Sequence, residues 1–421
     1  MTQTAALLAL RPAYLAGPPR GITSVCSAHP QVIGAALALG RAKNRPVLIE
    51  ATCNQVNQDG GYTGMTPAGF RRLVAGIAET LAVPDDLVIL GGDHLGPNPW
   101  RHLPAADAVD RAAVMVADYA AAGFRKLHLD CSMPCAEDPS PLPEAVIAAR
   151  AARLAAHAEA AARSAGHPPP VYVIGTEVPV PGGATEALGP LHVTSPAAAR
   201  MTVDLHRAAF AGIGLADAFR RCAALVVQPG VEFSQNEVLP YDPTRAADLV
   251  QGRSSLPGLV FEAHSTDYQT PDALAALVRD GFAILKVGPG LTFALRAALY
   301  DLVAQVGPSP GVPALPDVME RLMRARPADW SGHCGGDAAE QRRQRHEGLS
   351  DRIRYYWNEP DAQAAVGDLL RRADVAAGTG RLSLDGAQTA RDFLCRRVSR
   401  VLDDYWAACA PAAGAPPCPE T

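Results

Sequence analysis

Short apolar runs alternate with alanine-rich stretches along most of this chain, and this alternation constrains the fold more than any other feature. The runs are rich in Val, Ile and Leu, and the stretches between them carry apolar residues at helical spacing. The runs begin at residues 21, 46, 86, 126, 171, 224, 259 and 283. Alternating strands and helices predict a parallel sheet. Eight such units, with no strand left over, favour a closed (β/α)₈ TIM barrel over an open sheet.

The pattern changes near residue 305, where Pro and Gly punctuation is followed by polar, Arg-rich helical sequence. We therefore predict a barrel over 1–305, a helical C-terminal extension over 306–410 that packs on it, and a disordered Pro-rich tail over 411–421. The Arg-rich stretch 338–357 has two interpretations. It is either a solvated helix surface, or a surface that contacts another subunit or a phosphate group.

Composition limits the classes of partner. The 421 residues are 48% hydrophobic and 19% charged, which is enough apolar material for a large core. The net charge of −5 and the absence of a long basic run argue against nucleic acid and an anionic membrane, and favour a small-molecule substrate. The nine scattered cysteines are typical of reduced thiols. No signal peptide or membrane-spanning run is apparent, so we expect a cytoplasmic protein.

Polar and ionisable residues end every predicted strand, which is where barrel enzymes place their catalytic groups. They are Ser24 or Cys26, Glu50, Asp93 with His94, Asp130, Glu177, Gln228, His264 and Lys286. Burying so many charged groups without partners costs several kcal/mol each. We therefore expect them to converge on a functional site at one end of the barrel.

A divalent metal ion suits part of this set. His94, Glu177 and His264 supply two imidazoles and a carboxylate, which is a common ligand shell for catalytic Zn²⁺ with one position left open. Gln228, or Glu232 in the loop that follows, is the candidate fourth ligand. An amide ligand is less usual for zinc, so Mn²⁺ and Mg²⁺ stay open. A histidine at a strand end is about as often a simple hydrogen-bonding group.

The dipeptide Asp93-His94 lies in the stretch GGDHLGPN. Side chains alternate in direction along a strand, so we expect one of the two to bind the metal while the other faces the substrate. Glycine-rich loops follow several strands, and VGPG after the eighth strand precedes a helix that begins near Leu291. Backbone amides at such a helix N-terminus often bind phosphate, although the same glycines also make tight turns.

Several stretches resemble the D-tagatose-1,6-bisphosphate aldolase subunits GatZ and KbaZ. They are SVCSAHP, VLIEATCNQVNQDGGYTGMTP, ILGGDHLGPN, HLDCSM, YVIGTEVPVPGG, VVQPGVEF, FEAHSTDYQT, LKVGPGLTFALR and LSDRIRYYW, and they run from about residue 21 to 357. The chain also resembles, more distantly, the class II metal-dependent aldolases. That resemblance implies a catalytic Asp93, metal-binding His94 and His264, and a loop Glu177 before Gly182 and Gly183. The sequence departs from class II aldolases at Gln228-Pro229-Gly230, which replaces a histidine, and at Ser265-Thr266-Asp267, which replaces a phosphate loop.

The resemblance implies a metal-dependent enzyme that cleaves the C3–C4 bond of a ketohexose or its phosphate by retro-aldol chemistry. If the aldehyde fragment rotates before it adds back, the enzyme is a 4-epimerase, and if the fragment leaves, it is an aldolase. A third possibility is a non-catalytic partner of a separate class II aldolase subunit. A sugar kinase is disfavoured because the sequence has no G-x-x-x-x-G-K-[ST] loop.

These arguments predict three sets of site residues in a protein that we also expect to form a homo-oligomer. The catalytic set is Asp93, Glu177 and Asp130. The metal set is His94, Glu177, Gln228 and His264. The substrate-binding set is Ser24, Glu50, Asn54, Gln55, Asp267, Lys286 and Gly288.

Overall fold

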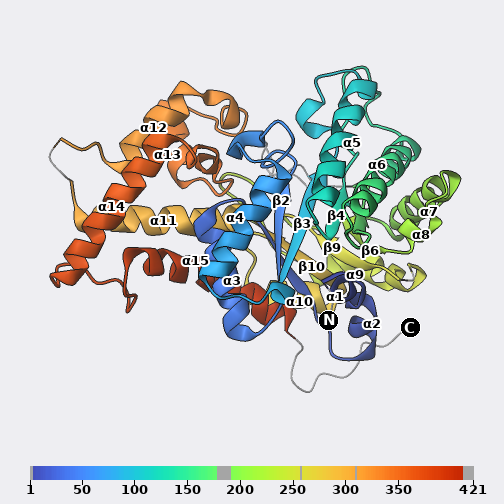
Figure 1. Cartoon of the computed structure of the whole chain (residues 1–421), viewed down its shortest axis with the longest axis horizontal. Helices are drawn as coiled ribbons and strands as arrows, with labels where there is room; N and C mark the ends of the chain where they lie inside the picture. The colour runs from blue at the N-terminus through green and yellow to red at the C-terminus, as the bar shows by residue number, and fades with distance from the viewer. Residues whose placement is uncertain (1–2, 178–190, 257, 309–310, 411–421) are drawn as a thin grey trace.

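The computed structural model describes residues 3–177, 191–256, 258–308 and 311–410, and it contains a closed barrel of parallel strands (Figure 1). The barrel order is β1-β10-β9-β6-β5-β4-β3-β2. The strands are β1 Ile22–Cys26, β2 Val47–Thr52, β3 Val88–Leu95, β4 Lys126–Leu129, β5 Val171–Ile174, β6 Cys222–Val227, β9 Val260–Ala263 and β10 Phe282–Val287. The predicted TIM barrel is therefore confirmed, with every strand inside or next to one of the predicted apolar runs.

The barrel helices begin at recognisable signals in the sequence. Five of them start with Pro directly after a residue whose side chain accepts a hydrogen bond from the first turn, which is a favoured N-terminus. These are α3 Pro30–Lys43, α4 Pro67–Thr80, α7 Pro196–Gly212, α9 Pro243–Gly252 and α10 Pro271–Arg279. The others are α5 Ala105–Ala121, α6 Glu144–Ser164, the short α8 Ala216–Phe219 and α11 Pro289–Val306. Together they connect and cover the strands.

The lower half of the barrel interior is apolar. Every second residue of a strand points inward, and the inward residues nearest the strand starts form one cluster, which includes Leu48, Ile89, Val171, Val173, Ala224, Val226, Val260 and Ile284. Two N-terminal helices, α1 Gln3–Leu8 and α2 Leu10–Ala16, close this end with Leu7, Leu10 and Tyr14. Polar chemistry is therefore confined to the opposite end, where the strands finish.

The C-terminal helices pack on the barrel, as predicted. Helices α12 Leu315–Ala325, α13 Ala338–Glu347 and α14 Pro360–Gly378 form a lobe around the far end of α11 (Figure 1). The last helix, α15 Ala390–Cys409, returns to the barrel and packs against α3, α10 and α11. It thus lies on the outside of the barrel between α10, which follows β9, and α3, which follows β1. The division at residue 305 stays a prediction, and 411–421 lie outside the described residues.

Three further observations complete the fold. A two-stranded hairpin, β7 Glu232–Phe233 with β8 Val238–Leu239, follows β6, and its strands are too short for the sequence pattern to indicate. All eight cysteines in the described part of the chain are free thiols. None of the described helices combines the length and the apolar character that crossing a membrane requires.

Candidate functional site

The upper half of the barrel interior is built from charged and hydrogen-bonding side chains. They occupy the inward positions that follow the apolar ones, so on several strands they recur two residues apart. The residues are Ser24 on β1, Glu50 on β2, Asp93 on β3, Lys126 and His128 on β4 with Asp130 just beyond, Glu262 on β9 with His264 just beyond, and Lys286 on β10. All are buried, so their charges have to be balanced within the barrel.

Two lysines and the carboxylates around them form the lower layer of this site. Lys126 Nζ lies 2.7 Å from Glu50 and 2.8 Å from Glu262, and Lys286 pairs with Glu50 and lies 2.7 Å from Asp93. Burial alone would lower the pKa of each ammonium group, but the surrounding carboxylates raise the pKa of both lysines above its usual value. Both lysines are therefore protonated, and neither offers a free amine for Schiff-base chemistry.

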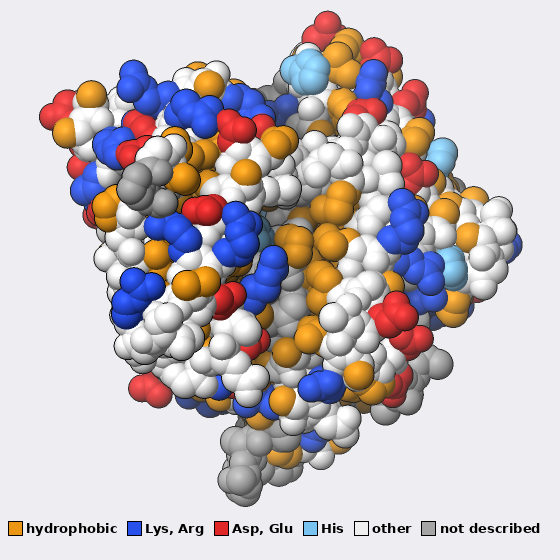
Figure 2. Space-filling model, turned by 60° about the vertical axis from the view of Figure 1, so that its left-hand side comes forward, with side chains coloured by type: hydrophobic (Ala, Val, Ile, Leu, Met, Phe, Trp, Pro, Cys, Tyr) orange, Lys and Arg blue, Asp and Glu red, His pale blue; other side chains and the backbone are white. Residues whose placement is uncertain are grey.

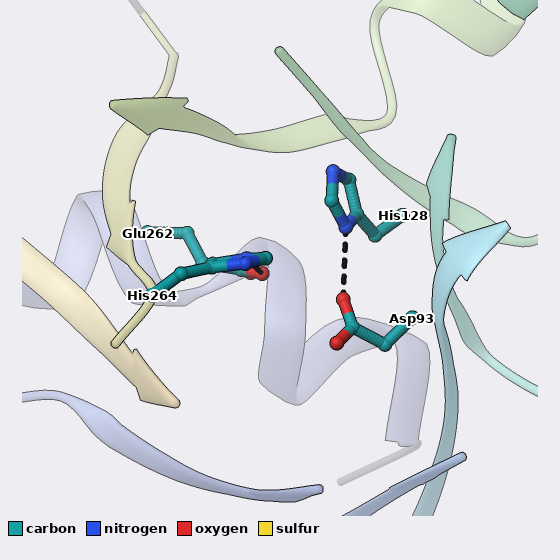
Figure 3. A group of neighbouring side chains, drawn as sticks. All are labelled: Asp93, His128, Glu262 and His264. Carbon is teal, nitrogen blue, oxygen red and sulfur yellow. Dashed lines mark hydrogen bonds and ion pairs between the residues drawn. The ribbon is translucent and has the colours of Figure 1, made fainter. Parts of the chain in front are cut away.

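Four side chains above this layer form a group that can hold a metal ion. Asp93, His128, Glu262 and His264 each offer one ligand atom, and these atoms all lie within 4.8 Å of one another. Figure 3 shows that they come from opposite walls, with Asp93 and His128 facing Glu262 and His264. His128 Nδ1 lies 2.8 Å from Asp93 Oδ1, and His264 Nε2 lies 2.9 Å from Glu262 Oε1.

The chemistry of this group fits a divalent cation. Two imidazoles and two carboxylates are ligands that Zn²⁺ and Mn²⁺ accept. His128 Nε2 is buried and has no hydrogen-bond partner among the described residues. The buried carboxyl groups of the site are Glu50, Asp93, Asp130 and Glu262, against two ammonium groups, Lys126 and Lys286. Apart from the histidines, the four carboxylates exceed the two ammonium groups by two negative charges, which is the charge that a divalent ion neutralises.

His94 lies next to this group rather than pointing away from it. Its backbone is in the left-handed region, with φ of 49°, and the pairing of β3 with β4 is irregular at this point. The turn brings His94 Nε2 to 3.6 Å from Asp93 Oδ2, while Asp130 holds Nδ1 at 2.8 Å. Burial would lower the pKa of His94, but Asp93 and Asp130 raise it. The expectation that Asp93 and His94 point in different directions does not hold, because a bulge interrupts the alternation.

Two of the predicted metal ligands lie apart from the group. Glu177 is exposed and accepts a hydrogen bond from Thr194. The side-chain oxygen of Gln228 accepts hydrogen bonds from the backbone amides of residues 230 and 231, at 2.7 and 3.0 Å. Glu232 is buried and accepts a hydrogen bond from its neighbour Phe233. In the structure, His128 and Glu262 take their places beside His264 in the group that can hold a metal ion. The pair Gly182-Gly183 lies outside the described residues.

His128 and Glu262 were missed by sequence reasoning, although a signal for them existed. Only the last one or two residues of each predicted strand were considered as site residues. Because inward side chains recur at every second position, the residues two places before Asp130 and His264 share their direction. Those positions are His128 and Glu262.

A pocket opens directly above the group. Its wall includes Asn54, Gln55, Asp267, Lys286 and Gly288, all of which were predicted to bind substrate, together with Asp93, His94 and His264. Ser24 and Glu50 lie beneath the pocket, where Ser24 Oγ donates to Glu50 at 2.6 Å. The opposite wall comes from the C-terminal lobe: Arg354, Tyr355, Trp357 and Asn358.

The expected phosphate site at VGPG is occupied by a side chain of the protein itself. Asp267 Oδ1 accepts hydrogen bonds from the backbone amides of Gly288, at 3.0 Å, and Gly290, at 2.7 Å. Burial raises the pKa of Asp267 to about 6, although these two hydrogen bonds oppose the shift. The amides at the start of α11 are therefore already bonded, and a phosphate group has to find other donors.

Comparison with known proteins agrees with this fold and shows the family. Residues 7–410 match the family described as D-tagatose-1,6-bisphosphate aldolase subunit GatZ/KbaZ-like. A protein of Agrobacterium fabrum named D-tagatose 6-phosphate 4-epimerase is 57% identical over 375 residues, which is 88% of each chain. A crystal structure from Sinorhizobium meliloti, described as a probable tagatose 6 phosphate kinase, is 52% identical with a TM-score of 0.83. The similarity covers 93% of this chain and 100% of that one. With its barrel, its rim of charged residues and this match over nearly its whole length, the chain belongs to the GatZ/KbaZ-like family.

Proposed function

We propose that this protein is a metal-dependent 4-epimerase that interconverts D-tagatose 6-phosphate and its C4 epimer, D-fructose 6-phosphate. The observation that carries the proposal is the buried group of Asp93, His128, Glu262 and His264 at the floor of the pocket. The name of the Agrobacterium relative supports the substrate and the reaction. Aldolase activity was our first expectation from the sequence, and the relative's name favours the epimerase alternative over it.

Inversion at C4 needs a route that does not remove the C4 hydrogen, because no carbonyl group lies next to C4. Cleavage of C3–C4 provides one, since the aldehyde fragment can rotate and present its other face before the bond forms again. Asp93, His128, Glu262 and His264 would hold a divalent ion, and the ion would supply the positive charge that stabilises the enediolate left by cleavage. We propose Zn²⁺, with Mn²⁺ and Mg²⁺ as alternatives. The protonated lysines beneath the site argue against an imine route.

Asp93 is the residue that we propose for proton transfer at the C4 hydroxyl. Its carboxylate lines the pocket between His128 and Lys286. It can take the hydroxyl proton as C3–C4 breaks and return it when the bond forms again. Lys286 stabilises the ionised carboxylate before the first transfer and after the second. Asp130 acts through His94, whose ring it holds at 2.8 Å, and is a positioning residue. A catalytic role for Glu177 stays a prediction.

The direct test is an assay of the purified protein alone. We expect it to convert D-tagatose 6-phosphate to D-fructose 6-phosphate, to lose this activity in EDTA, and to regain it with a divalent metal. Free triose should be a minor product. Triose as the main product would make the enzyme an aldolase. Activity that needs an added class II aldolase chain would make it the partner subunit instead.

Running the reaction in D₂O tests the route. Retro-aldol epimerisation keeps the original hydrogen on C4, so NMR of the product should show no deuterium there. Deuterium at C4 would contradict the proposal.

An ATP-dependent gain of a second phosphate would favour the kinase description that the Sinorhizobium structure carries.

A further inference from the structure

Among the described residues of the pocket wall, one cationic side chain forms no salt bridge with a carboxylate. Of the basic groups in this wall, Lys286 pairs with two carboxylates and His94 lies between Asp93 and Asp130. Burial lowers the pKa of His29 to about 4, so this side chain is neutral, and His264 belongs to the proposed metal-binding group. Arg354, on the C-terminal wall, has no salt bridge among the described residues.

This distinguishes Arg354 from the other arginines of the C-terminal lobe. Lys and Arg side chains are numerous over that part of the molecule, interspersed with acidic ones (Figure 2). Within the Arg-rich stretch, Arg342, Arg343 and Arg345 each pair with a glutamate. Arg342 and Arg343 are exposed and fit the interpretation as a solvated helix surface, whereas Arg345 is buried beside Glu320. Arg354 lies beyond α13, in the 3₁₀ helix η6 Arg352–Tyr356, and faces the pocket.

The guanidinium of Arg354 is held in place before any ligand binds. Nη1 donates to the carbonyls of Ser350 and Asp351, and Nη2 donates to the hydroxyl of Tyr355 at 3.2 Å. The guanidinium carbon also lies 4.6 Å from the centre of the Tyr355 ring. These bonds leave Nε and one N–H of Nη2 without a partner among the described residues. Nε and Nη2 share the edge of the guanidinium that binds two phosphate oxygens at once.

At the two helix starts that border the pocket, four backbone amides already donate to side chains of the protein. Asp267 bonds the amides of Gly288 and Gly290 at the start of α11. At the start of α3, the amide of His29 donates to Ser27 Oγ and that of Gln31 donates to His29 Nδ1. The usual helix N-terminal sites for phosphate are therefore satisfied by side chains of the protein.

We propose that Arg354 binds the phosphate group of the sugar phosphate, an inference that rests on the proposed function. The reacting carbons lie at the metal-binding end of the pocket, and the 6-phosphate extends toward the C-terminal wall. In this arrangement the C-terminal lobe selects phosphorylated sugars, and the residues of the barrel carry out the reaction.

The test compares Arg354→Met with a matched control, Arg352→Met. Arg352 lies on the same turn with its guanidinium carbon 4.3 Å from the same tyrosine ring, but it donates to the Asp329 carbonyl and does not line the pocket. The quantity measured is the ratio of kcat/KM for D-tagatose 6-phosphate to that for D-tagatose. Loss of a paired charge-assisted contact should lower this ratio roughly 10²-fold in Arg354→Met. Arg354→Lys should recover part of the loss, and Arg352→Met should keep the wild-type ratio.

A binding measurement separates this inference from the proposed function. Isothermal titration with inorganic phosphate and with D-tagatose 6-phosphate should show binding to wild-type protein and weakened binding to Arg354→Met and Arg354→Lys, whether or not the protein epimerises any sugar. An unchanged ratio and unchanged phosphate binding in both Arg354 variants would overturn the assignment. So would an equal effect of Arg352→Met. A ratio that rises in Asp267→Asn, which removes the charge of the side chain bonded to the α11 amides, and does not fall in Arg354→Met would place the phosphate at α11 instead.

Discussion

At the scale of single residues, the clearest question is which side chains hold the metal. We expect His128→Ala and Glu262→Gln to lose bound metal, because each removes a ligand atom of the buried group. The loss of affinity should exceed the 10- to 100-fold that is typical of an orienting partner. Glu177→Gln and Gln228→Leu are the matched controls from the set predicted by sequence, and they should keep the metal. Metal analysis of all four proteins decides between the two sets, and the reverse pattern would restore the sequence-based one.

Asp93 lies both in the metal-binding group and in the pocket wall, so its two roles need separate measurements. We expect Asp93→Asn to bind the metal more weakly, as the other ligand variants do, and still to lose roughly 10² to 10⁴ in turnover at saturating metal, because an amide cannot take up the proton. His94→Ala should lose both metal affinity and activity. Turnover of Asp93→Asn that recovers at saturating metal would show that Asp93 only supports the metal site.

Asp267 gives a prediction about pH and stability. Its pKa is raised to about 6 by burial, whereas an Asp in an unfolded chain has a pKa of about 3.9. Between about pH 3.9 and pH 6 the folded protein therefore binds more protons at this carboxyl than the unfolded chain does. Because of this difference, the free energy of unfolding falls as the pH rises from about 4 to above 6. Asp267→Asn mimics the protonated form. We expect it to be more stable than the wild type by up to about 3 kcal/mol at pH 7.5 and similar near pH 4.

Urea denaturation of both proteins across this pH range measures the difference in unfolding free energy. A difference that does not change with pH would mean that Asp267 keeps one protonation state throughout. A less stable Asp267→Asn at pH 7.5 would show that its hydrogen bonds to α11 outweigh the cost of burying its charge.

At the scale of elements, close approaches of the backbone set the ends of the strands. A Cβ on Gly96, just after β3, would lie 1.6 Å from the carbonyl oxygen of Asp130. Because that oxygen belongs to the backbone after β4, it cannot move without shifting Asp130 and His94. We expect Gly96→Ala to destabilise the protein by about 3 kcal/mol or more. Gly76→Ala, in exposed helix α4 with nothing near its Cβ, should instead stabilise it by about 0.5 to 1 kcal/mol. Chemical denaturation of both variants checks the opposite signs.

The elements also show what sequence alone can predict here. The strands were found because each is a continuous buried apolar run, and their order follows from the parallel barrel. His128 and Glu262 were within reach, through the two-residue period. The roles of Asp267 and Arg354 could not be predicted from the sequence. The capping of α11 by Asp267 and the position of Arg354 against a pocket formed by the barrel depend on tertiary contacts between distant segments, which local patterns do not encode.

At the scale of the whole molecule, α15 is part of the barrel wall. Its buried side chains pack against the barrel helices, and each contributes about 1.5 to 3 kcal/mol, so together they match the total stability of a typical domain. They include Phe393, Leu394, Val398, Leu402, Tyr405 and Trp406. We expect a chain that ends at residue 306 to aggregate, and a chain that ends at residue 410 to melt like the full protein. Melting curves and gel filtration test both, and a monomeric, cooperatively melting 1–306 fragment would contradict this view.

The position of α15 also determines when the protein can finish folding. The backbone amide of Gly21, directly before β1, donates to the carbonyl of Cys409 at 3.1 Å, and Arg45 bonds the carbonyls of Trp406 and Cys409. The flank of β1 is thus bonded to a helix that lies more than 360 positions later in the sequence. At 5 to 20 residues per second, the roughly 380 residues between them take about 20 to 80 seconds to synthesise. Throughout that interval the side of α3 that packs against α15 lacks this neighbour, so we expect the nascent chain to complete its barrel wall only after α15 has been synthesised.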